Sequence, residues 1–155
     1  MNAYADTGLL ISLYGRDEYS PQARSLTQRH KPTFVLTGFG EAEFANACQL
    51  CVFRRQWTSP EARVVRETFL SDIRAGVFQL EDVPAQIWKL TETLSEQHTP
   101  ALGTRTLDVL HVAIALLLRP EAFCSFDKRQ RNLAQAAGLR VLPSERLMIA
   151  AQSHR

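Results

Sequence analysis

Short apolar segments alternate with longer segments of helical pattern along almost the whole of this 155-residue chain. The segments expected to form strands are residues 2–5, 34–36, 77–80, 122–126 and 139–142. At least one segment expected to be helical separates each of them from the next. This alternation predicts an α/β fold with a mostly parallel sheet and helices on both faces. Right-handed crossovers then bring the carboxyl ends of the strands to one edge, where ligands of such folds bind.

The helices that we expect between these strands are defined by their apolar faces and by their cap residues. They cover residues 9–14, 20–30, 41–56, 59–75, 84–97, 106–118 and 128–137. Ser20 is expected to be the N-cap of the second helix. Residues 99–103 contain a proline and are expected to form a loop, whereas Ser144 is expected to cap a last helix.

The composition is that of an ordinary globular protein, with 45% hydrophobic and 22% charged residues. A formal net charge of +2 does not by itself indicate a protein that binds nucleic acid. The longest apolar stretch, residues 109–118, is too short to span a bilayer, and no secretory signal is visible, so we expect no membrane partner. Three cysteines in apolar segments favour reduced thiols and a cytoplasmic protein. We expect a single domain over residues 1–155.

Four acids lie where an apolar segment meets a turn, or on an otherwise apolar helix: Asp6, Glu43, Asp108 and Asp127. Two carboxylates about 4 Å apart repel each other by roughly 4 kcal/mol at an effective dielectric near 20. If the fold brings these acids together, some of them hold protons or a cation lies among them. Asp6 and Asp127 each follow an expected strand, but aspartate is also a good helix N-cap. These two residues alone therefore leave capping and chemistry equally open.

Asp108 is more informative, because it lies in the first turn of a helix that is apolar nearly all round. Such a helix is buried, and a buried carboxylate needs a partner, for which a metal ion is our preferred interpretation. Glu41 and Glu43 compete for the remaining position and point to different faces of their helix, since they are two residues apart. We choose Glu43, because it aligns with Ala47 and Leu50 on a stripe that we expect to face the core.

The residues around these acids resemble the PIN-domain ribonucleases of the VapC type, which are toxins of type II toxin–antitoxin systems. The resemblance rests on four blocks: Asp6–Thr7, Glu43–Ala47, Arg105–Ala113 and Ser125–Asp127. It implies a three-layer α/β/α sandwich with a central, mostly parallel sheet and a metal-dependent endoribonuclease activity. It further implies that the four acids bind Mg²⁺ or Mn²⁺, some directly and some through water. We expect Glu43 to be either a water-mediated ligand or the base for the attacking water. The implied partners are an RNA substrate, a cognate antitoxin and a second copy of the chain in a homodimer.

Three further residues are candidates for contact with the RNA substrate. Arg105 lies one helical turn before the third acid, and Ser125 and Thr7 match positions at which small hydroxyl residues support the site in that family. Arg54 and Arg55 are weaker candidates, since such clusters are more often solvated. Two other functions remain open. The chain is either a PIN nuclease that processes cellular RNA without being a toxin, or a non-catalytic RNA- or protein-binding module on the same fold.

Two features that invite a chemical interpretation are expected to be structural. Cys48 and Cys51 form a CxxC motif in the middle of an expected helix, with no second pair to complete a zinc site, which favours core packing. His111 lies three residues after Asp108 and is expected to be packed and hydrogen-bonded. The alternative for His111 is that it orients a ligand of the metal.

Overall fold

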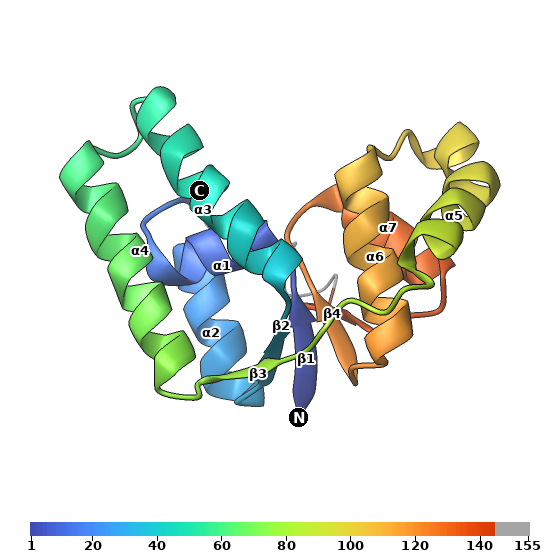
Figure 1. Ribbon diagram of the computed structural model, residues 1–155, viewed down its shortest axis with the longest axis horizontal. Coiled ribbons are helices and arrows are strands. Elements are labelled where there is room, and N and C mark those ends of the chain that lie inside the picture. The colour runs from blue at the N-terminus through green and yellow to red at the C-terminus, as the bar shows by residue number, and fades with distance from the viewer. Residues whose placement is uncertain (145–155) are drawn as a thin grey trace.

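The computed structural model describes residues 1–144, in which five strands alternate with seven helices (Figure 1). The elements in chain order are β1 (Asn2–Ala5), α1 (Thr7–Tyr14), α2 (Ser20–His30), β2 (Thr33–Leu36), α3 (Gly38–Phe53), α4 (Ser59–Arg74), β3 (Phe78–Leu80), α5 (Ile87–Leu102), α6 (Thr106–Leu118), β4 (Ala122–Cys124), α7 (Lys128–Ala136) and β5 (Val141–Leu142). The strand order in the sheet is β3–β2–β1–β4–β5, and every neighbouring pair is parallel. The predicted α/β fold with a parallel sheet is confirmed.

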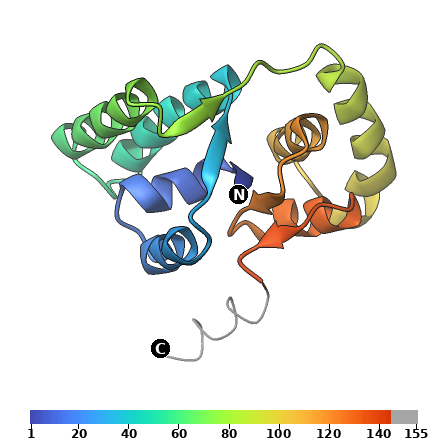
Figure 2. The same ribbon diagram turned by 90° about the horizontal axis from the view of Figure 1, so that it is seen from below.

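Alternate residues of the central strand β1 point to opposite faces of the sheet and meet two different groups of helices. Ala3 and Ala5 belong to a hydrophobic core under α1 to α4, whereas Tyr4 belongs to a second core under α5 to α7. Figures 1 and 2 show these two groups of helices on opposite sides of the sheet. The protein is therefore a three-layer α/β/α sandwich, as the resemblance implied.

The carboxyl ends of β1 and β4 form the topological switch point of the sheet. From β1 the sheet extends through β2 to β3 on one side and through β4 to β5 on the other. Asp6 follows β1 directly, and its backbone N–H donates to the carbonyl of Cys124 at the end of β4, at 3.1 Å. Ligands of parallel sheets bind in the crevice at such a point, so the first of the four acids lies at the expected ligand edge.

The start of α2 differs from the expected one in its cap. Its N-cap is Tyr19, which makes no side-chain capping bond. The Ser20 hydroxyl instead accepts from the backbone N–H of Asp17 at 3.0 Å and donates to the Asp17 carboxylate at 3.1 Å. Because the turn before the helix uses this hydroxyl, the prediction that Ser20 caps the helix is wrong.

The loop expected over residues 99–103 is also wrong, because α5 continues through Pro100 to its last residue, Leu102. The helix ends where Gly103 adopts the left-handed conformation with φ of 62°, in which glycine commonly terminates a helix. The helix expected after Ser144 lies outside the described residues. Within residues 1–144, no helix has both the length and the apolar character that crossing a membrane requires.

Candidate active site

One cleft with a volume of about 580 Å³ is lined by all four of the predicted acids. They come from four different parts of the fold, since Asp6 follows β1, Glu43 lies on α3, Asp108 lies on α6 and Asp127 precedes α7. The structure thus brings together residues that are far apart in the sequence. We call this space the acidic cleft.

Asp6 is 2% exposed, and hydrogen bonds engage both of its carboxylate oxygens. Oδ1 accepts from the backbone N–H of Leu9 at 2.8 Å and so caps α1, while Oδ2 accepts from the Ser125 hydroxyl at 2.5 Å. Burial raises the pKa of Asp6, and the charge of Asp127 adds to that effect, against the opposing hydrogen bonds. Asp6 is therefore both a helix cap and an acid of the cleft, so the two interpretations of this residue do not exclude each other.

Ser125 holds two of the acids in place. Its side chain is 0% exposed, and its hydroxyl donates to Asp6 and accepts from the backbone N–H of Asp127 at 3.0 Å. Ser125 thus supports the site, as the resemblance implied, and its contact with the substrate stays a prediction. Asp127 in turn caps α7, where its Oδ1 accepts from the backbone N–H groups of Arg129 and Gln130 at 2.8 and 3.1 Å.

Asp108 is buried in the first turn of α6, as expected, and Arg105 is its main partner. Its Oδ2 accepts from the backbone N–H of Arg105 at 2.9 Å and from Nε at 3.2 Å. Its Oδ1 accepts longer bonds from Arg105 Nη2 and Gln130 Nε2, each at 3.4 Å. Burial opposes ionisation of Asp108, but the hydrogen bonds and charge of Arg105 outweigh it and lower the pKa of this carboxyl. Arg105 thus pairs with an acid here, and its contact with RNA stays a prediction.

The face of α3 that carries Glu43 follows from where this helix begins. It starts at Gly38, capped by the Thr37 hydroxyl, three residues earlier than expected. The buried residues of α3 are Gly40, Phe44, Cys48 and Cys51. Each residue turns the helix by about 100°, so Glu43, Ala47 and Leu50 lie beside this stripe, and they line the acidic cleft. Glu43 is a cleft residue as predicted, but the stated reason, a stripe facing the core, is wrong.

Two hydrogen bonds hold the Glu43 carboxylate. Its Oε2 lies 2.5 Å from Nε2 of His111 and also accepts from the Thr7 hydroxyl. Burial opposes ionisation, but the hydrogen bonds of His111 and Thr7 favour the charged form, and the pKa of Glu43 is lowered. The prediction that His111 is packed and hydrogen-bonded is confirmed, and its partner is an acid of the cleft. Thr7 lines the cleft, and its own contact with RNA stays a prediction.

The carboxylates suit a hydrated divalent ion. Within residues 1–144, no three His, Cys, Asp or Glu side chains lie close enough together to ligate one ion directly. Mg²⁺ prefers hard oxygen ligands, keeps several waters, and is usually bound through one or two carboxylates. A cleft of about 580 Å³ lined by carboxylates has room for an ion with such a water shell. The donor set thus fits Mg²⁺ or Mn²⁺, whose binding stays a prediction.

A second cleft, of about 480 Å³, adjoins the acidic cleft and shares several of its lining residues. Asp6, Asp127 and Arg54 line both clefts, while Lys128 lines the second one. Arg55 lines neither, because α3 ends at Phe53 and Arg55 adopts a left-handed backbone with φ of 59°. Sequence reasoning could not separate the two arginines, since the predicted helix included both.

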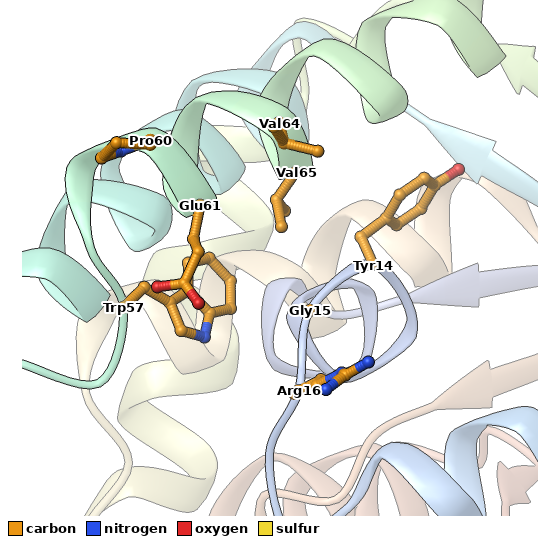
Figure 3. Close-up of a pocket in the computed structure, with 8 residues that line it drawn as sticks. All are labelled: Tyr14, Gly15, Arg16, Trp57, Pro60, Glu61, Val64 and Val65. Atoms are coloured by element: carbon orange, nitrogen blue, oxygen red, sulfur yellow. The ribbon is translucent and has the colours of Figure 1, made fainter.

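A third pocket, of about 410 Å³, lies away from the acidic cleft, between the end of α1 and the start of α4 (Figure 3). Its walls include Tyr14, Gly15, Trp57 and Val64. The one acid among its lining residues, Glu61, already accepts the backbone N–H and hydroxyl of the helix cap at position 58. This pocket therefore has no free acid, and the acidic cleft is the candidate active site.

Gln130 is a residue of the acidic cleft that sequence reasoning missed. It lines the cleft, is largely buried and donates to Asp108 across 22 positions of sequence. The signal that was available is its place three residues after Asp127, where its backbone N–H completes the cap of α7.

Together, the fold and the site define a class of protein: a parallel α/β/α sandwich with a carboxylate cleft at the switch point of its sheet.

Known proteins resemble this chain in their three-dimensional structure. No protein-family model matches the chain, and no curated protein matches it. Among solved structures, VapC20 of Mycobacterium tuberculosis, described as a sarcin–ricin loop cleaving toxin, aligns with a TM-score of 0.64 and 18% identity over 88% of this chain and 95% of its own. VapBC2 of Rickettsia felis, bound to a DNA fragment from its promoter, aligns with a TM-score of 0.60 and 12% identity over 91% of this chain and 97% of its own.

A third structure, a protein of Pyrobaculum aerophilum, aligns with a TM-score of 0.57 and 15% identity over 99% of this chain and 90% of its own. Each alignment covers nearly the whole of both chains, while the sequence identities are low. The likeness is therefore one of fold. The chain shares the fold of these VapC structures, a PIN-like α/β/α sandwich, and the predicted fold is confirmed.

Proposed function

We propose that this protein is a metal-dependent endoribonuclease that cleaves RNA phosphodiester bonds, and that it is the toxin of a toxin–antitoxin pair. The observation that carries the proposal is the meeting of four carboxylates in one cleft at the switch point of a VapC-like fold. A binding module would gain nothing from four such mutually repelling acids. VapC20, which has this fold, is described as a sarcin–ricin loop cleaving toxin.

The acids of the cleft have different roles in the hydrolysis. A divalent ion held by Asp6, Asp108 and Asp127, in part through its water shell, would lower the pKa of a bound water and withdraw charge from the phosphate. Glu43 has a lowered pKa and is ionised near neutral pH. It takes a proton from the attacking water while the water oxygen bonds to phosphorus. The bridging P–O bond breaks with its electron pair going to the leaving ribose oxygen, which is protonated by solvent water. The helix caps at Asp6 and Asp127 hold their carboxylates in place beforehand.

Cations along the two clefts supply the contacts to the RNA backbone. Arg54 lines both clefts, so it is the arginine that we expect to bind a phosphate, and Arg55 is its matched control. Each phosphate contact on a single strand contributes about 0.7 to the slope of log affinity against log salt. Arg54→Ala should lower that slope by about this amount when cleavage is measured as kcat/KM. Arg55→Ala should leave it unchanged.

The direct test is cleavage of total RNA by the purified chain with Mg²⁺, Mn²⁺ or a chelator, followed by mapping of the new ends. We expect cleavage with a divalent ion and none with chelator. Glu43→Gln should abolish it, whereas Glu41→Gln, the same change two residues earlier on α3, should not. Full cleavage in chelator, or by Glu43→Gln, would overturn the proposal.

Expression of the chain alone separates a toxin from a nuclease that processes cellular RNA. A toxin arrests growth, and Asp6→Asn should relieve the arrest while asparagine still caps α1. RNA cleavage without growth arrest would indicate the processing nuclease. Arrest by the Asp6→Asn protein would instead indicate a binding module. Co-purification with the product of an adjacent gene tests the antitoxin partner, and light scattering tests the homodimer.

A further inference from the structure

Tyr4, His111 and Glu43 form a continuous hydrogen-bonded chain from the middle of the sheet to the acidic cleft. The Tyr4 hydroxyl lies 2.9 Å from Nδ1 of His111, and Nε2 of the same ring lies 2.5 Å from Oε2 of Glu43. Tyr4 and His111 are each 2% exposed. Phe39 packs edge-on against the imidazole, with ring centroids 5.0 Å apart, and Tyr4 contacts it from a second direction at 5.7 Å. The orientation of the imidazole is therefore fixed by packing as well as by hydrogen bonds.

The chemistry of Glu43 and Tyr4, at the two ends of this hydrogen-bonded series, determines which nitrogen of His111 carries the proton. A carboxylate offers only acceptor lone pairs, so Nε2 carries the proton in the bond between His111 and Glu43. In a neutral imidazole Nδ1 is then an acceptor, and the Tyr4 hydroxyl donates to it. The opposite tautomer would place the Nε2 lone pair against a carboxylate oxygen only 2.5 Å away, which is repulsive.

The two oxygens of Glu43 are not equivalent. His111 and Thr7 both engage Oε2, from α6 and from the start of α1. In the part of the chain that the structure describes, no hydrogen bond engages Oε1. Because Glu43 lines the acidic cleft, Oε1 is the oxygen left for a water or an ion there.

We propose that Tyr4 and His111 are positioning residues for Glu43: the Tyr4 hydroxyl holds His111 in the Nε2–H tautomer, and this N–H holds Glu43 Oε2 so that Oε1 receives the proton of the attacking water. Neither Tyr4 nor His111 touches the RNA. The role of Oε1 rests on the proposed nuclease function. The tautomer rests on the geometry alone and has its own measurement.

That measurement is the long-range ¹H–¹⁵N correlation spectrum of the imidazoles in the labelled full-length chain. His111 is assigned by the signal that disappears in His111→Gln. We expect one protonated nitrogen, Nε2, and one unprotonated nitrogen, Nδ1, in the parent chain. Tyr4→Phe should shift Nδ1 and admit the second tautomer. A protonated Nδ1 in the parent chain, or an unchanged spectrum in Tyr4→Phe, would overturn the proposal.

Kinetics then test what the hydrogen-bonded chain does for Glu43. Tyr4→Phe should lower kcat about tenfold at unchanged KM, as for other partners that orient a reacting group. Tyr14→Phe is the matched control, because the Tyr14 hydroxyl donates to Asp72 on α4 at 2.6 Å, and neither residue lines the acidic cleft. It removes the same kind of bond and should leave kcat unchanged. His111→Gln keeps an N–H donor and should retain more activity than His111→Leu.

The outcomes separate this inference from the proposed function. Equal kcat in Tyr4→Phe and Tyr14→Phe, with both variants folded by circular dichroism, overturns the positioning role. If the parent chain cleaves no RNA with any divalent ion, the proposed function fails. The imidazole spectrum then decides on its own whether Tyr4 sets the tautomer of His111.

Discussion

Replacement of Arg105 by alanine removes the guanidinium that partners Asp108. The Nε–Oδ2 distance of 3.2 Å corresponds to a gross attraction of about 5 kcal/mol at an effective dielectric of about 20. The Arg105 side chain is 66% exposed, so water screens most of this attraction. Exposed pairs contribute a net of about 0.2–1 kcal/mol. Asp108 also keeps the backbone N–H of residue 105, which alanine provides equally. We therefore expect Arg105→Ala to lower the free energy of unfolding by about 1 kcal/mol in chelator.

The same change should raise the affinity for divalent ions. The Arg105 guanidinium occupies both oxygens of Asp108, so a cation has to compete with it for this carboxylate. Once the guanidinium is gone, Mn²⁺ should stabilise the variant more than the parent chain. At saturating ion, each tenfold gain in affinity adds about 1.4 kcal/mol to the free energy of unfolding. The deficit seen in chelator should therefore disappear in excess Mn²⁺.

Urea unfolding followed by circular dichroism, in chelator and in excess Mn²⁺, measures both effects. Arg55→Ala is the control, because it removes an arginine that does not line the cleft, and we expect it to show neither effect. If the free energy of unfolding falls by about 3 kcal/mol or more in chelator, Arg105 and Asp108 behave as a buried ion pair, whose disruption leaves an uncompensated charge. A deficit that stays the same in Mn²⁺ would refute the competition between Arg105 and the ion.

Three further changes test other contacts. Ser125→Ala should lower the free energy of unfolding by about 1–3 kcal/mol, since it removes the hydroxyl bonded to buried Asp6; urea unfolding measures this. Gly15→Ala should cost about 1–3 kcal/mol and displace Trp57, because the added Cβ would lie 2.2 Å from its ring; tryptophan fluorescence reports the displacement. Native protein at about pH 8 should not react with a thiol reagent, because burial raises the pKa of Cys124 to about 12 and also raises that of the other two thiols. Reaction before unfolding would contradict this.

The sheet and its helices could be predicted because their signals are local. Residues 2–5 and 106–118 are short or apolar runs with clear ends, and they coincide with β1 and α6. The errors fall at helix ends, where a single side chain or glycine determines the residue at which the helix begins or ends. Ser20 bonds to a turn, and Gly103 rather than Pro100 ends α5. Such ends depend on hydrogen bonds that the sequence alone does not specify.

The membership of the acidic cleft could also be predicted, but the bonds within it could not. The pair Arg105–Asp108 is local, since the two residues lie three apart on one helix turn. The bond between His111 and Glu43 joins residues 68 positions apart and requires α3 and α6 to meet over the edge of the sheet. No local pattern encodes that meeting. The same meeting places Glu43 in the cleft, although the stripe on which its choice rested does not face the core.

Each acid of the cleft has its own partners, and these offset the repulsion between the carboxylates one residue at a time. Asp6 and Asp127 accept from backbone N–H groups at helix starts, and Glu43 accepts from His111 and Thr7. These donors are backbone groups or largely buried side chains, so an incoming ion cannot displace them without disturbing the fold. The Arg105 guanidinium is exposed and can swing into water. We therefore expect a divalent ion to meet the least resistance at Asp108, and the ion affinity of Arg105→Ala is the most direct test of whether this cleft binds a cation.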